Sequence, residues 1–379
     1  MRKDFLPFAR PCFSQAEIEA AAEVIRSGHL TTGPKVTEFE ERFCEYLGEG
    51  FHAVALNSCT AGLFLGLLSH GVGPQDEVIV PTWTFVATAH VVLWTGARPV
   101  LCDVEESSLN IDVRALEKSI GKKTKAIIPV HFAGYPCAMD EICRIAKKHN
   151  LAVIEDAAHA CGTAYKGKKI GGFGDLTAFS FYATKNLACG EGGMVVSRDR
   201  KTIEKIRKLS YFGINKRAFD RYTQKGSWYY EIEELGYKYN MDSIHAAIGL
   251  VQLAKLEEMN LRRREIAGMY RRGLDKRIRF TEDSEENFHN YHLFLIRIDK
   301  EIIPRDEFIG KLKERNIGSS VHFIPLHRHP FYRKISKKKF PVADKAYAEA
   351  VSIPLFPGMS DQDVEYVIDN VNQVLKGGG

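Results

Sequence analysis

The sequence lacks any segment that would hold a protein in a membrane or send it out of the cell. No run of residues approaches the 18 apolar positions that a membrane-spanning helix needs. The first residues, Met1–Pro7, include charged side chains and lack the long apolar stretch of a signal peptide. We therefore expect a protein of the cytoplasm that makes no use of a membrane.

Metal-binding cysteine motifs are also missing. The eight cysteines are scattered, and none forms a Cys-x-x-Cys pair, which disfavours a zinc knuckle. Several stand among apolar neighbours, as Cys102 does, and are typical of small core residues in a reducing compartment. The group His322, His327 and His329 has no carboxylate or cysteine partner at a suitable spacing. The sequence thus predicts no metal site.

A strong excess of one charge is absent as well. The chain has 53 Lys and Arg against 48 Asp and Glu, a net charge of +5, which is too small and dispersed to indicate nucleic-acid binding. One basic cluster, Arg333, Lys334 and Lys337–Lys339, lacks the interleaved aromatics of a base-stacking surface and is typical of a solvated loop. We expect no nucleic-acid partner, whereas a substrate that bears a diphosphate would suit the charge.

The phosphate loop of nicotinamide-dependent dehydrogenases is the last notable absence. That fold places Gly-x-Gly-x-x-Gly between the first strand and its helix. Here Gly71-Val-Gly73 precedes a strand, and Gly171-Gly-Phe-Gly174 does not open a helix. A dehydrogenase remains compatible with the strand pattern alone but is disfavoured by these glycines.

What is present, from about residue 52, is a regular alternation of short apolar runs with helical patterns. Such an alternation indicates an α/β fold with a mostly parallel sheet. The predicted strands are 52–56, 77–80, 99–102, 125–130, 151–155, 176–181 and 193–197. The predicted helices between them lie near 60–70, 85–95, 112–120 and 138–149.

The flanking regions are more helical, and the length of 379 residues favours two domains. We predict a large domain over 1–250 and a smaller C-terminal domain over 251–379. Ser14 and Ser360 precede acidic residues at the spacing of capping boxes. The remaining predicted elements are a helix over 241–272, a strand over 291–298, a helix over 305–316, a strand over 319–323, a loop over 324–341, and helices over 342–350 and 361–375.

Three segments carry residues suited to chemistry. The first is Ala55-Leu-Asn-Ser-Cys-Thr-Ala-Gly62, at a strand-to-helix junction. Ser58, Thr60 and the free N–H groups at the start of the helix could hold a phosphate, helped by the helix dipole. Taken alone, the segment is more often a plain helix cap.

The second segment, Leu151-Ala-Val-Ile-Glu-Asp-Ala-Ala-His159, ends an apolar strand in acidic residues. Ligand sites of parallel sheets lie at the carboxyl ends of strands, so Asp156 could pair with a protonated pyridine nitrogen. A helix cap is an equally good interpretation of Asp156 alone. His159 could lie beside a ring, although a lone histidine is more often structural.

The third segment is Phe179-Ser-Phe-Tyr-Ala-Thr-Lys-Asn-Leu-Ala-Cys-Gly-Glu-Gly-Gly193. Lys185 stands between an aromatic strand and a glycine-rich turn, whereas most lysines lie on solvated surfaces. Desolvation there would lower the pKa of the amine and free it to form a Schiff base. Ser180, at the end of the same strand, could reach a phosphate.

Read together, these segments resemble the DegT-type family of sugar aminotransferases. The resemblance extends from Leu30-Thr-Thr-Gly-Pro34 to Ile353-Pro-Leu-Phe-Pro-Gly358 and includes Pro129-Val-His-Phe-Ala-Gly134. It implies the fold type I of transferases that depend on pyridoxal phosphate (PLP). In that fold, helices sandwich a mixed, mostly parallel seven-stranded sheet, and a smaller α/β domain follows.

The resemblance also implies roles for individual residues. Lys185 matches the lysine that binds PLP covalently, and Asp156 the aspartate that pairs with its ring nitrogen. His159 falls beside the ring, where many members have Gln. The remaining matches are the phosphate ligands Ser180, Ser58, Thr60 and Ala61, the ring-stacking Phe85 with Trp83 as the weaker candidate, and Asn240, which would reach the phosphate of a neighbouring subunit.

The implied reaction moves the amino group of glutamate through PLP to a nucleotide-linked 4-keto sugar, UDP-linked by resemblance, and leaves 2-oxoglutarate. The match of Asn240 implies a homodimer with shared active sites. Thr31, Arg262 and His322 are the predicted substrate contacts, although a run of arginines such as Arg262–Arg264 more often lies on a solvated helix face. A dTDP- or GDP-linked sugar, amination at carbon 3, and a noncatalytic regulator are the alternatives. Related dehydratases have histidine in place of the lysine, whereas this chain keeps Lys185.

Overall fold

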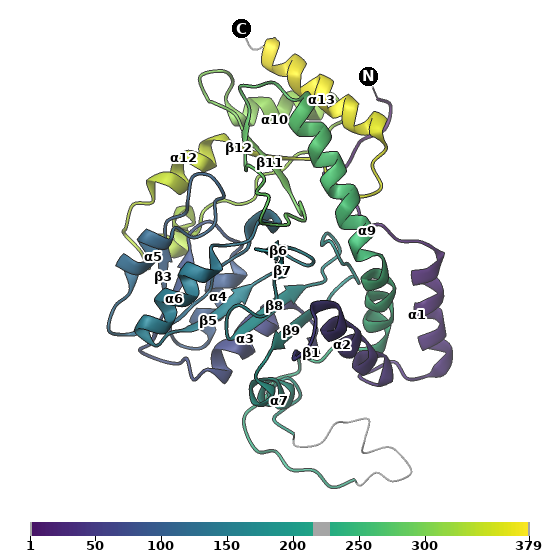
Figure 1. Cartoon of the computed structure of the whole chain (residues 1–379), viewed down its shortest axis with the longest axis vertical. Coiled ribbons are helices and arrows are strands. Elements are labelled where there is room, and N and C mark those ends of the chain that lie inside the picture. Colours follow the sequence, from purple (N-terminus) through teal and green to yellow (C-terminus); the bar gives the residue numbers. More distant parts are fainter. Residues whose placement is uncertain (1, 215–227, 378–379) are drawn as a thin grey trace.

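The computed structural model describes residues 2–214 and 228–377 and contains a large central sheet with helices on both faces (Figure 1). Its seven strands have the order β1-β9-β8-β5-β4-β2-β3, and only β9 runs antiparallel to its neighbours. The predicted mixed, mostly parallel sheet is thus confirmed. Its strands are β1 (His52–Leu56), β2 (Glu77–Pro81), β3 (Arg98–Cys102), β4 (Thr124–Ile127), β5 (Ala152–Asp156), β8 (Leu176–Ser180) and β9 (Gly193–Ser197).

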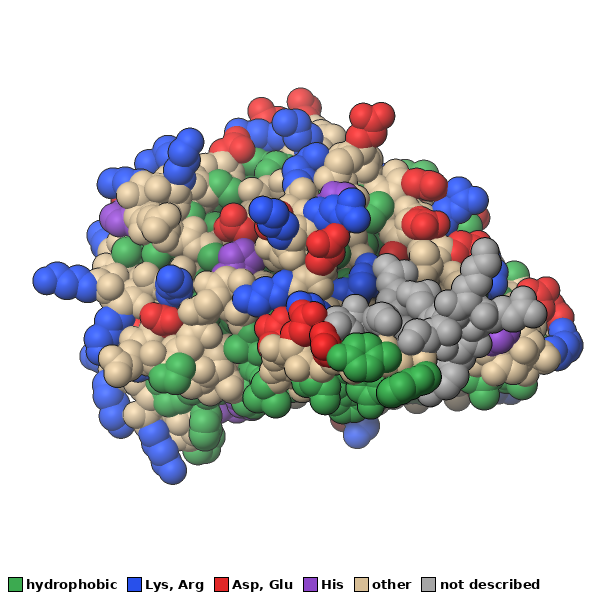
Figure 2. Space-filling view, turned by 90° about the horizontal axis from the view of Figure 1, so that it is seen from below, with side chains coloured by type: hydrophobic (Ala, Val, Ile, Leu, Met, Phe, Trp, Pro, Cys, Tyr) green, Lys and Arg blue, Asp and Glu red, His purple; other side chains and the backbone are tan. Residues whose placement is uncertain are grey.

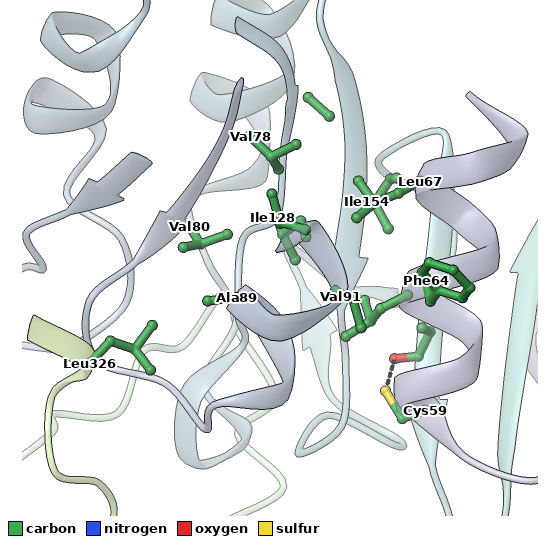
Figure 3. Packing of buried hydrophobic residues seen from close by; sticks show 14 of the residues in the cluster. Cys59, Phe64, Leu67, Val78, Val80, Ala89, Val91, Ile128, Ile154 and Leu326 are labelled. Atoms are coloured by element: carbon green, nitrogen blue, oxygen red, sulfur yellow. Dashed lines mark hydrogen bonds between the residues drawn. The ribbon is translucent and has the colours of Figure 1, made fainter. Parts of the chain in front are cut away.

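Helices bury both faces of this sheet, and alternate residues along each strand point to opposite faces. Val78 and Val80 belong to one apolar cluster, and Ile79 between them belongs to the other. In Figure 3, Ile154 of the sheet lies beside Leu67 of a covering helix. The first face is covered by α3 (Cys59–Ser69), α4 (Ala87–Trp94) and α7 (Arg200–Leu209). The second face is covered by α2 (Pro34–Leu47), α5 (Val113–Ser119), α6 (Met139–His149) and part of α9 (Ser243–Gly273).

A second, three-stranded antiparallel sheet lies beyond the large one, near the C-terminal helix in Figure 1. It has its own apolar cluster, which includes residues of α9, α10 and α13. The elements of this region are β10 (Arg279–Phe280), β11 (Phe294–Arg297), α10 (Arg305–Glu314), η2 (Leu326–Arg328), α11 (Pro330–Arg333), α12 (Pro341–Glu349), β12 (Ala350–Ile353) and α13 (Asp361–Lys376).

Two predictions in this region are wrong. Residues 319–323 do not form a strand. Only Ser320 bridges to Ser352, and His322 and Phe323 instead line a cavity at the edge of the large sheet. The predicted loop 324–341 contains the short helices η2 and α11. The third strand of the small sheet is instead β12, which directly follows α12.

The long helix α9 connects the two regions. It packs against α1 (Gln15–Ser27), α2 and α13. The predicted domain boundary between residues 250 and 251 falls within α9, and it stays a prediction. The predicted capping boxes at Ser14 and Ser360 are confirmed. The remaining short elements are η1 (Phe132–Gly134), β6 (Ala164–Tyr165) and β7 (Lys168–Lys169).

Within residues 2–214 and 228–377, no helix is long and apolar enough to cross a membrane. All eight cysteines are free thiols.

Candidate active site

The chemistry-bearing residues meet where strands of the large sheet end. β1, β5 and β8 end at Leu56, Asp156 and Ser180, and the segment that follows each strand contributes to one cavity of about 600 Å³. This position agrees with the rule that ligands of such sheets bind at the carboxyl ends of parallel strands. Among its lining residues are Phe8, Ser58, Cys59, Thr60, Thr84, Phe85, Thr88, Asp156, His159, Ser180, Tyr182, Lys185, Glu191, His292, Leu293, His322 and Phe323.

The start of α3 forms one wall of the cavity. Ser58 and Thr60 line it, and the Ser58 hydroxyl caps the helix by accepting a hydrogen bond from the Ala61 N–H at 3.1 Å. The two interpretations of Ser58, as a helix cap and as a cavity residue, therefore apply together. Ala61 is buried and does not line the cavity, and its N–H already serves the cap.

Gly193 lets the helix start lie close to β9. A Cβ atom at this position would come within 2.4 Å of the backbone carbon of Ser58. Real contacts of this kind do not occur, so a side chain at Gly193 would push the start of α3 away. The glycine-rich turn after Lys185 thus has a packing role at the wall that holds Ser58.

Asp156 is a buried carboxylate without an ion-pair partner among the described residues. Its Oδ2 accepts a hydrogen bond from the Thr88 hydroxyl at 2.9 Å, and its Oδ1 accepts one from the Ala158 N–H at 3.1 Å. Burial raises the pKa of Asp156, while these hydrogen bonds and the charge of Lys185 oppose the rise. The carboxylate is therefore held in place while still lacking a cation.

Lys185 lies on the loop after β8, in a turn closed by a hydrogen bond from its N–H to the Tyr182 carbonyl at 2.8 Å. Burial lowers the pKa of its amine to about 8, although the negative charge of Asp156 acts in the opposite direction. Nζ makes no hydrogen bond or ion pair with any described residue. It is an amine that is partly unprotonated near neutral pH, as a nucleophile must be.

His159 lies beside this pair, and its ring is enclosed by other rings. The ring centroids of His292 and Phe323 lie 4.3 Å and 5.9 Å from its own. Nδ1 of His159 accepts a hydrogen bond from the Ala133 N–H at 3.3 Å. Burial holds the pKa of His159 well below its usual value, so the ring is neutral and carries its proton on Nε2.

The two aromatic candidates differ in position. Phe85 lines the cavity and is 57% exposed, whereas Trp83 is fully buried, packs against Phe132 and does not line it. Of the two, the geometry favours Phe85 as the residue that can stack on a bound ring. Ser180 also lines the cavity, as the sequence predicts.

The predicted substrate contacts are not all brought together. His322 lines the cavity, with Phe8 packed against it at a ring distance of 4.9 Å. Thr31 is exposed outside the cavity. The Arg262 guanidinium binds the Met359 carbonyl at 2.8 Å and Asp361 at 2.7 Å, at the contact of α9 with α13, and does not line the cavity.

Asn240 also lies outside this chain's cavity, although it is adjacent to the segment that forms it. It bridges to Leu56 at the end of β1, and its Nδ2 donates to the Thr32 hydroxyl at 2.6 Å. A contact with the neighbouring subunit's cofactor therefore stays a prediction for Asn240.

Several lining residues were not predicted. Thr88 and Phe8 come from the start of α4 and from the N-terminal segment, and His292, Leu293 and Phe323 come from the region around the small sheet. No local sequence signal marks them, since their role depends on the approach of segments far apart in the chain. The described part of the chain has no cluster of three or more His, Cys, Asp or Glu side chains that could bind a metal ion.

The residues present fit PLP. The carboxylate of Asp156 lacks a cation, the amine of Lys185 lacks an acceptor, and the start of α3 offers N–H groups and hydroxyls for an anion. PLP has a protonated ring nitrogen that can pair with Asp156, an aldehyde that can react with Lys185, and a phosphate that the start of α3 can bind. Fold and site together define a PLP-dependent aminotransferase of fold type I.

The comparisons with known proteins agree with this class. Residues 11–372 match the DegT/DnrJ/EryC1/StrS aminotransferase family, and the chain belongs to that family. The resemblance inferred from the sequence motifs is therefore confirmed, as are PLP as cofactor and sugar amination as the kind of reaction.

Individual relatives extend over nearly the whole chain. The spore coat polysaccharide biosynthesis protein SpsC of Bacillus subtilis is 48% identical, over 99% of this chain and 98% of that protein. Helicobacter pylori PseC, an aminotransferase involved in the biosynthesis of pseudoaminic acid, superposes with a TM-score of 0.92 at 30% identity, over 99% of this chain and 100% of that one. Spr1654 from Streptococcus pneumoniae, in its PLP form, gives 0.92 at 33% identity with the same coverage.

Proposed function

We propose that the chain transfers the amino group of glutamate to a UDP-linked 4-keto sugar and produces a 4-amino sugar nucleotide. The observation that carries the proposal is the cavity that holds Lys185 and Asp156 together with Ser58, Thr60 and Ser180. Relatives named for the biosynthesis of a spore coat polysaccharide and of pseudoaminic acid support a sugar acceptor. The nucleotide and the carbon atom rest on the resemblance of Gly236–Met241, Leu261–Ile266 and Ser320–Pro325 to enzymes of UDP-linked 4-keto sugars.

When bound, PLP supplies an aldehyde that takes up an amino group and a ring that withdraws electrons from it. We assign the ring nitrogen to Asp156, the phosphate to Ser58, Thr60 and Ser180, and the ring face to Phe85. Asp156 is suited to this role because Thr88 and Ala158 fix both carboxylate oxygens. Its buried negative charge stabilises a proton on the nitrogen.

Lys185 would move the proton in this reaction. Its Nζ takes the proton from the carbon that bears the amino group of glutamate. In the second half of the reaction it returns a proton to the sugar carbon. A pKa of about 8 suits this task, because an amine near neutrality can both accept and release a proton at the pH of the cell. Lys185 has no competing hydrogen-bond partner in the described structure that would hold Nζ away.

A homodimer with shared active sites is part of the proposal. Trp228, Ile232 and Leu235 are 84%, 68% and 83% exposed, in the segment that leads to Asn240. Figure 2, which shows the molecule from below, has hydrophobic side chains gathered along one edge of the face in view. Exposed apolar groups of this kind mark protein contacts, and a second copy would cover them and bring Asn240 toward its cavity. Eight free thiols also suit the proposed cytoplasmic location.

A two-stage assay with purified, PLP-loaded protein tests the proposal. Glutamate alone should yield 2-oxoglutarate in an amount stoichiometric with active sites. UDP-, dTDP- and GDP-linked keto sugars are then added separately, and the aminated carbon is read by NMR. We expect turnover with the UDP-linked 4-keto sugar. Turnover with another nucleotide or at carbon 3 would correct the substrate, and failure to release 2-oxoglutarate would favour a noncatalytic protein.

A further inference from the structure

His292 lines the cavity but has no part in the chemistry described above. Its side chain comes from the segment just before β11, on the small-sheet side of the cavity, and the residue is only 6% exposed. Nδ1 lies 2.9 Å from Oδ1 of Asn186, the residue that follows Lys185.

A chain of buried amides fixes which nitrogen of His292 carries the proton. Nδ2 of Asn260 donates to the Cys161 carbonyl at 3.1 Å, so Oδ1 of Asn260 faces Asn186. Nδ2 of Asn186 donates to that oxygen at 2.7 Å, and Oδ1 of Asn186 therefore faces His292. An amide oxygen only accepts hydrogen bonds, so Nδ1 of His292 is the donor.

Nε2 of the neutral His292 ring therefore bears a lone pair. Burial and the neighbouring positive charge of Lys185 keep the pKa of His292 well below its usual value, so this lone pair persists at neutral pH. Nε2 has no partner among the described residues. Nε2 is not fully enclosed by protein atoms, so it is accessible from the cavity.

A ligand that forms a hydrogen bond with this lone pair must carry a hydrogen-bond donor. A carboxylate of glutamate would be repelled, and the ammonium group of glutamate is the group that reacts at Lys185. A 4-keto hexose presents hydroxyl groups on carbon 3, beside its carbonyl, and on carbon 2. We propose that His292 determines sugar specificity by accepting a hydrogen bond from one of these hydroxyls, an inference that rests on the proposed function.

The geometry favours discrimination as well as binding. The tilted rings of His159 and His292 lie 4.3 Å apart between centroids, and His159 carries its proton on Nε2, so a donor and an acceptor are neighbours. Because His292 is nearly closed off from solvent, a sugar without the matching hydroxyl would leave Nε2 unpaired. An unpaired buried acceptor costs more free energy than the hydrogen bond gains.

The test combines variants of His292 with substrates that lack single hydroxyls. UDP- and dTDP-linked 4-keto-6-deoxyhexoses and their 2-deoxy and 3-deoxy derivatives are assayed with wild type, His292→Phe and His292→Leu. Both variants remove the acceptor, and the second serves if the first fails to fold. His292→Gln is the rescue variant, because its amide can donate to Asn186 and still offer an oxygen to the sugar.

His289→Phe is the matched control. His289 is equally buried in the same segment, but it bonds to the Ala133 carbonyl at 3.1 Å and does not line the cavity. Its replacement should disturb local packing to a similar extent and leave the discrimination among sugars unchanged.

In wild type, loss of one particular hydroxyl should raise KM about tenfold or more with little change in kcat. His292→Phe and His292→Leu should raise the KM of the complete sugar by a similar factor and abolish the difference between it and that deoxy sugar, while His292→Gln restores part of it. Equal discrimination in wild type and both variants, or the same loss of discrimination in His289→Phe, would overturn the proposal. Failure of the proposed function looks different, because wild type would then convert no keto sugar.

Discussion

The Thr88 hydroxyl at the start of α4 donates a hydrogen bond of 2.9 Å to Oδ2 of Asp156 at the end of β5. Two neighbouring segments at the edge of the large sheet thereby fix one carboxylate in the wall of the cavity. Thr84 supports the arrangement, since its hydroxyl lies 2.8 Å from that of Thr88. Removal of one hydroxyl should therefore affect catalysis without altering a charged group.

Replacement of Thr88 by Val should slow the glutamate half-reaction about tenfold, because the hydrogen bond from its hydroxyl to the charged carboxylate is lost. It should also raise the pKa of Asp156 further, since Thr88 opposes the effect of burial. Stopped-flow absorbance across pH measures both effects. Thr95→Val is the control, because Thr95 bonds only within its own segment at the end of α4. Equal slowing in both variants would show a general packing defect.

Folding stability of the cofactor-free protein should depend on pH through Lys185. Folding lowers the pKa of this amine from 10.5 to about 8, so the unfolded chain binds the proton more tightly. The resulting penalty is fully present below pH 8 and disappears as pH rises toward 10.5. With allowance for solvent in the cavity, the Lys185→Met variant should be more stable than wild type by about 2 kcal/mol at pH 7.

Urea unfolding of the two cofactor-free proteins at pH 7, 8, 9 and 10 measures this difference. The gap should narrow steadily above pH 8, whereas a contribution from hydrophobicity alone would be independent of pH. A constant gap over this range would show that the Lys185 amine has an ordinary pKa.

Gly193→Ala should weaken both stability and cofactor binding. The added Cβ would meet the backbone of Ser58, and the resulting displacement should cost about 2 kcal/mol of folding free energy. It should also raise the dissociation constant of PLP, because Ser58 belongs to the wall assigned to the phosphate. Gly310→Ala is the control, since a Cβ there meets nothing within 4 Å. A variant with unchanged PLP affinity would separate Gly193 from the phosphate site.

Shared active sites can be tested by complementation. Lys185→Ala and Asn240→Asp proteins should each be nearly inactive. A mixed dimer would contain one intact site, with Lys185 from one subunit and Asn240 from the other. Co-expression with two affinity tags, followed by sequential purification, isolates this species. Its activity should approach half that of wild type, while a mixed dimer of Lys185→Ala and Lys185→Gln should have none. An inactive mixed dimer of the first kind would place both residues in the same subunit's site.

Most of the large sheet could be predicted from the sequence alone, because strands buried on both faces appear as short apolar runs between amphipathic helices. It also pointed to Ser58, Asp156, His159, Ser180 and Lys185, which lie at or shortly after strand ends and line one cavity at the same edge of the sheet. It failed where position depends on long-range contacts. His322 was assigned to a strand that does not form, and His292 looked like part of an ordinary apolar run.

Arg262 shows that a residue predicted from the sequence to contact the substrate can have a purely structural position. The family resemblance suggests Arg262 as a substrate contact, but in this structure its guanidinium binds the Met359 carbonyl and Asp361. No local pattern distinguishes an arginine that binds a substrate from one that joins two helices, because the partner lies about a hundred residues away in the chain. The same reason explains why Phe8 and Thr88 were not predicted as cavity residues.

The covalent attachment of PLP to Lys185 is the step on which the whole mechanism depends. Reduction of the PLP-loaded protein with borohydride, followed by proteolysis and mass spectrometry, identifies the modified residue. We predict a single pyridoxyl label on Lys185, and none in Lys185→Ala treated in the same way. A label on another lysine, or no label in protein that has bound PLP, would contradict the assignment of Lys185.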